Sequence, residues 1–372
     1  MAWMKNYEAL LKLPEILIRS RLAFTYDGIP LVARRLSVKQ KTNLLKLGLS
    51  SLLGSNRMLG LPAIIQIEPT DICNLKCPLC PASEEAPDGK RGYMTYETFQ
   101  KILEELGDVL IAVYLYSWGE PFLNKDINRM IRACTDRNIL TLIPTNGQCL
   151  QTLDEALAVV DSGLSAIVIA TDGSTQEIYQ VYRKGGDLEK VKNCASLIEE
   201  AKSKRNSPFP YTCMRTVITR DNQDDLPNIE QLARELGVNM FATKTVGCKT
   251  QYEVYKDYEP TEASLRRFAY DGETRADKPP IRCIYPFRQP SIKRDGTVIG
   301  CEFDYKLESP WGKIGEQKFS DIWNSPQARE LRHRVRHGLK GTFCEKNCPY
   351  QDRVLDSCSI YCKEFHPLEI WL

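Results

Sequence analysis

The sequence predicts an α/β fold built on a parallel sheet. Between residues 63 and 245, six apolar runs rich in β-branched residues alternate with helical patterns. Strands joined by crossover helices pair in parallel. The chain of 372 residues is long enough to bury a large core, and its net charge of +2 argues against a nucleic-acid partner.

The six strands are expected at 64–68, 110–116, 139–143, 165–170, 212–218 and 239–244. Helical patterns lie at 95–106, 125–136, 187–203 and 225–236. Parallel sheets carry their chemistry at the carboxyl ends of the strands. Segments rich in polar residues or cysteine follow the first four strands there: 73–80, 118–121, 145–147 and 171–173. We therefore expect one functional site at this edge of the sheet, in a domain spanning 63–250.

Residues 1–62 have a different character. Up to residue 57, ten Lys and Arg stand against Glu8, Glu15 and Asp27, which gives a net charge of +7. Leucines at 45, 49, 52 and 53 follow helical spacing and predict an amphipathic helix. Two interpretations stay open. In the first, this region is a basic helical extension packed on the next domain. In the second, residues 1–57 form a basic surface that binds an anionic membrane, a lipid substrate or an acidic partner.

The last quarter of the chain is rich in cysteine. A stretch with proline and charge, 251–280, is expected to be a linker, and 281–372 a small further domain with a hairpin at Asp295-Gly296 and a basic helix near 325–338. No apolar run reaches the length of a membrane-spanning helix, and residues 1–13 lack a long apolar signal segment. We expect a cytoplasmic protein, with membrane association only at the periphery.

Fourteen cysteines and three histidines favour sulfur ligands over a histidine-based metal site. Cys73, Cys77 and Cys80 share one loop with CxxxCxxC spacing. A structural zinc normally takes four protein ligands, whereas a [4Fe–4S] cluster held by three cysteines keeps one iron open for another ligand. Spacing alone favours the cluster and leaves zinc with a distant fourth cysteine as the alternative. Five scattered cysteines are expected to be small buried side chains: Cys134, Cys149, Cys194, Cys213 and Cys248.

The loop CNLKCPLC at 73–80 resembles the cluster loop of the radical S-adenosylmethionine (SAM) superfamily, with Leu79 where an aromatic residue is usual. Residues 117–121 (SWGEP) resemble its GGEP segment, with Trp118 in place of the first glycine, and 145–147 (TNG) its third-strand signature. Residues 170–186 are similar to a stretch of the SPASM or twitch branch. The resemblance spans about 63 to 362 and implies a partial (β/α)6 barrel.

The resemblance implies that the open iron of the cluster on the three loop cysteines chelates SAM. Glu120 and the Gly119 backbone would meet the methionine ammonium, and Arg183 the carboxylate. Asn146 and Asp172 would bind ribose hydroxyls. The alternative interpretation is that Glu120, Arg183, Asn146 and Asp172 are helix caps or turn residues.

The resemblance extends to the C-terminal cysteines. Four of them fit the auxiliary-cluster framework of SPASM and twitch domains and would hold a second [4Fe–4S] cluster: Cys283, Cys301, Cys344 and Cys348. Cys358 and Cys362 are left over, either as spare thiols or as partial ligands of a further cluster. A zinc knuckle is the remaining interpretation.

Such an enzyme takes an electron from a donor such as a flavodoxin or ferredoxin, cleaves SAM to a 5′-deoxyadenosyl radical and abstracts hydrogen from an unactivated carbon. The resemblance implies this activity, in a net oxidation or bond-forming modification of a peptide, a sugar or aminocyclitol, or a lipid-linked substrate. The alternative is a non-enzymatic iron–sulfur protein for electron transfer or sensing, which would not need Glu120 or Asp172. The sequence identifies no catalytic acid, base or hydrogen donor.

Overall fold

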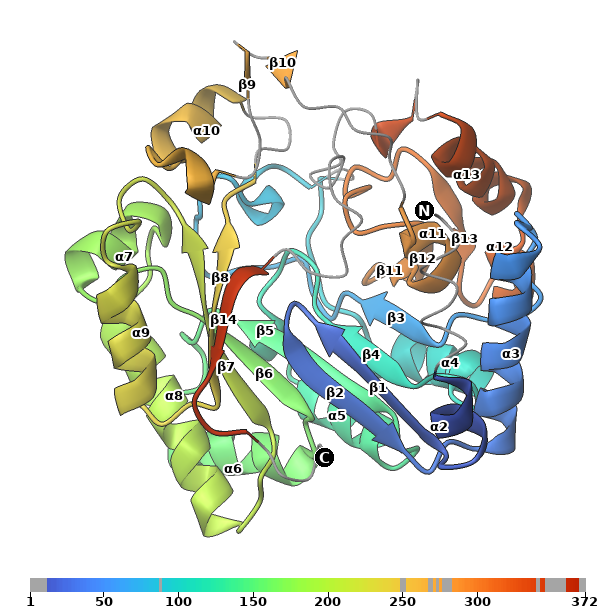
Figure 1. Cartoon of the computed structure of the whole chain (residues 1–372), viewed down its shortest axis with the longest axis horizontal. Coiled ribbons are helices and arrows are strands. Elements are labelled where there is room, and N and C mark those ends of the chain that lie inside the picture. Colours follow the sequence, from blue (N-terminus) through green and yellow to red (C-terminus); the bar gives the residue numbers. More distant parts are fainter. Residues whose placement is uncertain are drawn as a thin grey trace.

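The computed structural model describes residues 12–86, 89–247, 252–266, 270–271, 274–275, 283–338, 342–344 and 359–367. At its centre, six parallel strands follow one another in chain order (Figure 1). They are β3 (Ile64–Ile67), β4 (Ala112–Leu115), β5 (Leu140–Thr145), β6 (Ala166–Ala170), β7 (Tyr211–Ile218) and β8 (Met240–Thr245). All six predicted strands are present, which confirms the α/β fold.

Helices connect these strands and bury their apolar faces against the sheet. They are α4 (Tyr96–Leu106), α5 (Ile127–Thr135), α6 (Leu153–Ser162), α7 (Gln176–Tyr182), α8 (Leu188–Lys204) and α9 (Leu226–Glu235). Helices α6 and α7 were not predicted, although the capping box of Thr152 and Glu155 is a readable start signal for α6. Helix α4 shows the usual arrangement, because its buried residues are all apolar: Phe99, Ile102, Leu103 and Leu106.

The segments after residue 283 extend the same sheet at both edges. At one edge, β11 (Ser291–Ile292) pairs in parallel with β3, and β12 (Thr297–Ile299) and β13 (Pro310–Lys313) follow in antiparallel order. At the other edge, β14 (Ser359–Glu364) pairs antiparallel with β8. The part expected as a further domain at 281–372 therefore shares its sheet with the barrel.

Among the described residues of this part, α11 (Tyr285–Arg288), α12 (Phe319–Trp323) and α13 (Pro326–His337) accompany these strands. Helix α13 is the predicted basic helix, and the predicted hairpin turn at Asp295-Gly296 joins β11 to β12.

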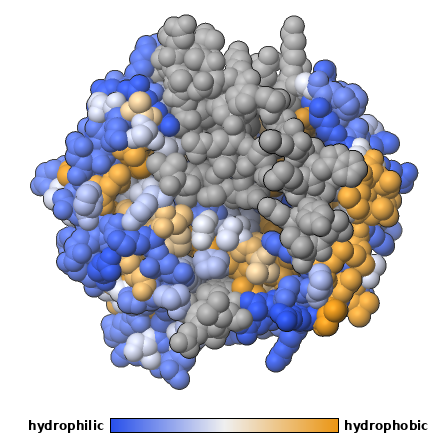
Figure 2. Space-filling view, viewed as in Figure 1, coloured by the Kyte–Doolittle hydropathy of each residue, from blue (hydrophilic) through white to orange (hydrophobic). Residues whose placement is uncertain are grey.

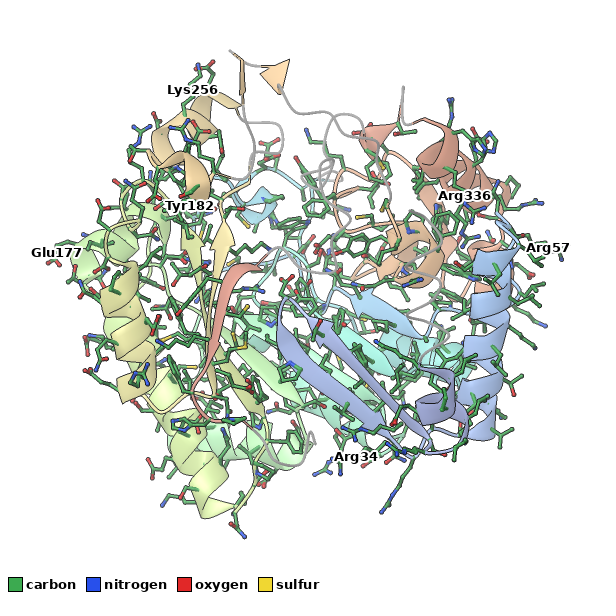
Figure 3. All side chains as sticks on the ribbon, in the orientation of Figure 1. Arg34, Arg57, Glu177, Tyr182, Lys256 and Arg336 are labelled. Atoms are coloured by element: carbon green, nitrogen blue, oxygen red, sulfur yellow. The ribbon has the colours of Figure 1, made fainter. Side chains whose placement is uncertain are left out.

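Part of the expected linker at 251–280 is packed against the barrel. Helix α10 (Tyr252–Tyr258) buries Tyr255 and Tyr258 against the loop that follows β3. The Tyr258 ring contacts that of Tyr182, whose place beneath α10 is labelled in Figure 3. Residues 252–258 therefore belong to the barrel domain. The short strands β9 (Tyr270–Asp271) and β10 (Thr274–Arg275) form a separate pair.

The N-terminal region is helical only in part. Residues 21–34 form a hairpin of β1 (Arg21–Tyr26) and β2 (Ile29–Arg34), where a helical extension was expected. The reason is local, because Asp27 and Gly28 adopt the left-handed backbone that a tight two-residue turn requires, with φ of 47° and 86°. The hairpin lies across the strands and fills one side of the sheet with Ile29 and Leu31 (Figure 1).

Helices α2 (Leu13–Leu17) and α3 (Val38–Leu52) flank this hairpin in the chain. Helix α3 is the predicted amphipathic helix, but its leucine stripe faces solvent, with Leu45, Leu49 and Leu52 all exposed. The extension contacts the barrel through Gln40 and Asn43 of α3, which hydrogen-bond to Leu110 and Leu61, and not through this leucine stripe.

Candidate active site

The loop after β3 brings three cysteines to the mouth of the barrel. Cys73, Cys77 and Cys80 line a cavity of about 260 Å³ at the carboxyl ends of the parallel strands. Local hydrogen bonds shape the loop: the Ile72 amide donates to the Thr70 hydroxyl at 3.0 Å, and the Cys80 amide to the Cys77 carbonyl at 3.1 Å. The predicted ligands thus share one cavity.

Burial disfavours the thiolate form of these cysteines unless a positive charge lies nearby. It raises the pKa of the Cys77 thiol to about 11 and raises that of Cys73 above its ordinary value. Arg183 opposes the shift at Cys77, with Nη1 3.8 Å from the sulfur. Bound iron would lower the pKa of these thiols for the same reason.

The residues present fit an iron–sulfur cluster better than a single metal ion. In the described part of the chain, no three Cys, His, Asp or Glu side chains form a group that could hold one ion. A [4Fe–4S] cluster does not need such convergence, because each cysteine binds a different iron. The buried Ser117 hydroxyl beside the cavity has no hydrogen-bond partner among the described residues, which leaves a polar contact for a ligand.

Gly119 is required by a close approach of two backbone segments. A Cβ on this residue would lie 2.2 Å from the Thr70 carbonyl oxygen and 2.7 Å from that of Ile72. The Glu120 amide donates to the same Ile72 carbonyl at 2.9 Å. The segment after β4 therefore packs directly on the start of the cysteine loop, and only glycine fits there.

Glu120 lies buried in the wall of the cavity. One carboxylate oxygen accepts from the Thr145 hydroxyl at 2.9 Å and the Phe122 amide at 3.2 Å, and the other accepts from the Asn146 amide at 2.8 Å. Burial raises the pKa of Glu120, and these hydrogen bonds oppose the rise. A carboxylate has about four acceptor positions, so one is left for a cationic group of a ligand.

Asn146 ties the end of β5 to the cysteine loop. Its amide nitrogen donates to the Asn74 side-chain oxygen at 2.7 Å and lies 3.8 Å from the Cys73 sulfur.

Cys149, one of the scattered cysteines, lies next to this loop. Its sulfur is 3.8 Å from the side-chain nitrogen of Asn74, and the residue is only partly buried. Cys248 lies outside the described residues, and the other scattered cysteines are buried as predicted: Cys134, Cys194 and Cys213.

Asp172 is not among the residues that line the cavity, and its contact with ribose stays a prediction. One carboxylate oxygen accepts from Arg183 Nε at 2.5 Å, and the other accepts from the Val217 amide at 2.7 Å. The Asp172 side chain is fully buried, whereas Arg183 reaches the cavity. Asp172 is therefore a positioning residue that holds the Arg183 guanidinium.

Trp118 connects the cysteine loop to the C-terminal region. Its indole nitrogen donates to the Glu302 carbonyl at 3.2 Å, and its ring packs edge-on against Phe303 and Tyr305. Its own carbonyl oxygen lies 3.9 Å from the Cys80 sulfur. The residue that replaces the first glycine of the GGEP-like segment thus joins the two cysteine-rich parts of the chain.

Sequence reasoning missed the opposite wall of the cavity, which we call the hairpin wall. Tyr26 of the hairpin donates its hydroxyl to that of Tyr116 at 2.5 Å, and Asp27 forms an ion pair with Arg215 at 3.0 Å. The complete hairpin wall consists of Tyr26, Asp27, Tyr116, Arg215, Lys244 and Glu302.

Signals for the hairpin wall were present in the sequence. Arg215 and Lys244 are single charged residues in otherwise apolar or uncharged strands, where a buried charge needs a function or a partner. Asp27-Gly28 between two strand-like runs is a strong short-range hairpin signal.

Three of the four predicted auxiliary ligands lie within the described residues. Cys301 and Cys344 are buried in one apolar cluster, and Cys283 packs against it. Cys348 and Cys358 lie outside the described residues. The three described cysteines thus all contact the main apolar core that the barrel and the C-terminal segments share.

Cys362 lies elsewhere, on β14. Strand β14 is at the opposite edge of the sheet from β12, which leads into Cys301. The Cys362 sulfur lies 3.8 Å from the Asp27 carbonyl oxygen. Cys362 is therefore next to the hairpin turn.

Residues 67–233 match the radical SAM superfamily, and residues 283–349 match SPASM, an iron–sulfur cluster-binding domain. The first match includes the loop cysteines, Glu120, Asn146 and Arg183. The chain belongs to the radical SAM superfamily. It is an enzyme of the SPASM branch. Membership implies a [4Fe–4S] cluster, SAM, a reductant and auxiliary iron–sulfur binding. It also argues against the alternative of a non-enzymatic iron–sulfur protein.

Similar proteins act on different substrates. A probable GTP 3′,8-cyclase of Methanocaldococcus jannaschii is 28% identical over 213 residues, covering 57% of this chain and 68% of that protein. The PqqA peptide cyclase of Bradyrhizobium diazoefficiens is 26% identical over 187 residues, 50% of this chain and 47% of that protein, so the match spans about half of that relative.

Among solved structures, Streptococcus suis SuiB bound to S-adenosylmethionine superposes with a TM-score of 0.59 at 16% identity. The superposition covers 84% of this chain and 76% of SuiB. At this identity the likeness shows the shared fold alone.

Proposed function

We propose that the enzyme cleaves SAM reductively to a 5′-deoxyadenosyl radical and abstracts hydrogen from an unactivated carbon, in a net oxidation or bond-forming modification. The observation that carries the proposal is that the three loop cysteines meet Glu120 and Arg183 at one cavity. When bound, the cluster would supply the electron for SAM cleavage and an open iron for the amino acid end of SAM.

The protein's part on this side of the cavity is to bind and orient SAM. Glu120 keeps an acceptor for the methionine ammonium, and Arg183 presents donors to the carboxylate. Asp172 fixes Arg183, so that little conformational entropy is lost when the ligand binds. Asn146 holds the cysteine loop to β5. We call these residues and the loop 73–80 the cluster wall.

The hairpin wall is proposed to face the substrate. Its Asp27–Arg215 pair, Lys244 and Glu302 place charged groups in the lining of the cavity. Such groups suit the hydroxyls, amides or charges of a polar molecule better than an aliphatic chain. The supported substrate class is therefore a peptide, a sugar-like molecule or the polar end of a larger molecule.

One auxiliary cluster is proposed, on Cys283, Cys301, Cys344 and Cys348. The SPASM match ends at residue 349, before Cys358, and Cys362 lies at the other edge of the sheet. Glu302 and Phe303 follow Cys301 directly and line the cavity, so this cluster would lie next to the substrate side.

Anaerobic loading with iron and sulfide, metal analysis, and chromatography for 5′-deoxyadenosine after dithionite reduction with SAM test the proposal. We expect about eight irons per chain in the wild type. The C73A/C77A/C80A variant should retain about four irons and form no 5′-deoxyadenosine. The control C134A/C194A/C213A, which removes three cysteines from elsewhere, should keep both properties. Zinc without sulfide, or cleavage that survives in the first variant, would contradict the proposal.

A further inference from the structure

Helix α3 packs Leu44 and Leu47 against the core but exposes more aliphatic surface than an ordinary surface helix. The residues that it buries most deeply are polar: Gln40, Asn43 and Ser50. The side chains that it exposes are large and aliphatic, with exposed fractions from 43% to 78%: Val38, Leu45, Leu49 and Leu52. We call these four residues the apolar face of α3.

Hydrogen bonds fix this rotation of the helix. The Gln40 side chain donates to the Leu110 carbonyl at 2.7 Å. The Asn43 side chain donates to the Leu61 carbonyl at 2.7 Å and accepts from the Leu61 amide at 2.8 Å. Turning the leucines inward would leave these backbone groups unpaired in the interior, which is unfavourable. The outward direction of the apolar face is therefore built into the fold.

Neighbouring segments enlarge the apolar face. Lys41 donates to the Leu17 carbonyl at 3.0 Å, which holds the exposed Leu17 and Ile18 beside α3. At the other end, Leu53 and Leu59 are exposed. Of the ten large hydrophobic side chains exposed in the described part of the chain, eight lie between residues 17 and 59. Figure 2 shows the resulting hydrophobic area at the right, where Figure 1 places α3.

The part of the chain that carries this patch is basic. The described residues 12–57 contain nine Lys and Arg against Glu15 and Asp27, which gives +7. Helix α3 contains three lysines and no acidic residue. Figure 3 labels Arg57 beside one end of α3 and Arg34 at the base of the hairpin.

We propose that α3 lies flat on an anionic membrane surface, with its apolar face at the level of the lipid headgroups and its lysines against the phosphates. An aliphatic stripe flanked by lysines is the pattern of a helix that binds in the membrane interface. A second copy is a poorer occupant, because pairing through this face would bring the lysines of one α3 close to those of the other. In the described part of the chain no helix is long and apolar enough to cross a membrane, so the contact is peripheral.

This inference does not rest on the proposed function, and the test does not use activity. The full-length protein is centrifuged with vesicles of phosphatidylcholine alone, or with an equal part of phosphatidylglycerol, and the bound fraction is measured. The variant L45Q/L49Q/L52Q removes the leucines, and K39Q/K41Q/K46Q removes charge from α3. The matched control K190Q/K192Q/K204Q removes three lysines from α8, on another side of the barrel. Thermal unfolding confirms that each variant is folded.

We expect wild type and the α8 control to bind the phosphatidylglycerol vesicles and not those of phosphatidylcholine alone. The bound fraction of the leucine variant should fall at least about tenfold below that of the wild type. The α3 lysine variant should also bind less than the wild type. No binding by wild type, equal binding to both vesicles, or equal loss in the α8 control would overturn the proposal. If the wild type is a dimer and the leucine variant a monomer, the face is assigned to a second copy instead. If the protein captures an acidic protein and does not bind vesicles, the face is assigned to a protein partner.

Discussion

The two walls of the active-site cavity are built in different ways. The cluster wall comes from segments after four consecutive parallel strands, and its central motif is a single loop of eight residues, 73–80. The hairpin wall joins distant parts of the chain: Asp27 and Arg215 are 188 residues apart, and Gln66 donates to Glu302 across 236 residues. The central motif of the cluster wall is therefore local in sequence, whereas the hairpin wall consists mainly of contacts between segments far apart in the chain.

The difference also separates the roles of the two walls. Polar groups of the cluster wall hydrogen-bond one another and the loop cysteines, so a change there should disturb cofactor binding. Polar groups of the hairpin wall bond mainly to one another. A change in that wall should leave SAM binding intact and alter what happens to the substrate.

The largest effect is expected from D172A in the cluster wall. The change leaves the Arg183 guanidinium largely buried without its carboxylate partner and should cost about 3 to 5 kcal/mol of unfolding free energy. It should also weaken SAM binding, because Arg183 is no longer held toward the cavity. Urea unfolding and a SAM-binding titration measure both effects.

The control D161A breaks the ion pair with Arg205, both of whose side chains are about half exposed, and should cost at most about 1 kcal/mol. If D172A were as mild as D161A, the positioning role of Asp172 would be wrong.

G119A should be the next most disruptive change. The added methyl group would overlap the Thr70 and Ile72 carbonyl oxygens, and such overpacking costs about 1 to 3 kcal/mol. It should also reduce the iron bound, because the cysteine loop must shift. G48A is the matched control: its Cβ would meet no atom within 4 Å, so this helical position should gain about 0.5 to 1 kcal/mol. Normal iron content in G119A would show that the close approach does not shape the cluster site.

D27N tests the hairpin wall directly. The asparagine keeps a hydrogen-bond acceptor for Arg215 but removes the charge, so we expect a loss of about 1 to 2 kcal/mol in stability. SAM affinity and iron content should equal those of the wild type. A loss of SAM affinity as large as in D172A would mean that the two walls do not have separate roles.

The smallest effect, taken per pH unit, is a pH dependence from Asp304, in the segment that follows Cys301. Its carboxylate accepts from the Glu308 and Ser309 amides at 2.7 and 2.9 Å, and burial raises its pKa to about 6. Because the folded state binds this proton more tightly, the contribution of Asp304 to stability falls as the pH rises from about 4 to about 6, by at most about 1 kcal/mol per pH unit.

D304A should remove that contribution. The wild type should therefore lose its stability advantage over D304A as the pH rises through this range, as followed by urea unfolding at several pH values. An advantage that grows with pH would contradict the raised pKa of Asp304.

Much of the fold was predictable because strand and helix periodicity alternate so regularly between β3 and β8. The sequence also indicated the loop cysteines, Glu120, Asn146 and Arg183 through motifs at strand ends. It could not show that Asp172 points at Arg183 and away from the cavity, because that depends on where β7 places Val217. Likewise, leucine spacing revealed a stripe on α3 but not which side faces the core. Hydrogen bonds to Leu61 and Leu110 decide that.

The most direct test of the central claim is electron paramagnetic resonance of the dithionite-reduced protein before and after SAM is added. The variant C283A/C301A/C344A/C348A should remove the signal of the proposed auxiliary cluster and leave that of the cluster proposed on Cys73, Cys77 and Cys80. If those three cysteines hold a cluster with one open iron, SAM should change its spectrum, and the change should need more SAM in D172A than in D27N. A spectrum that SAM leaves unchanged, in a fully loaded protein, would contradict the account.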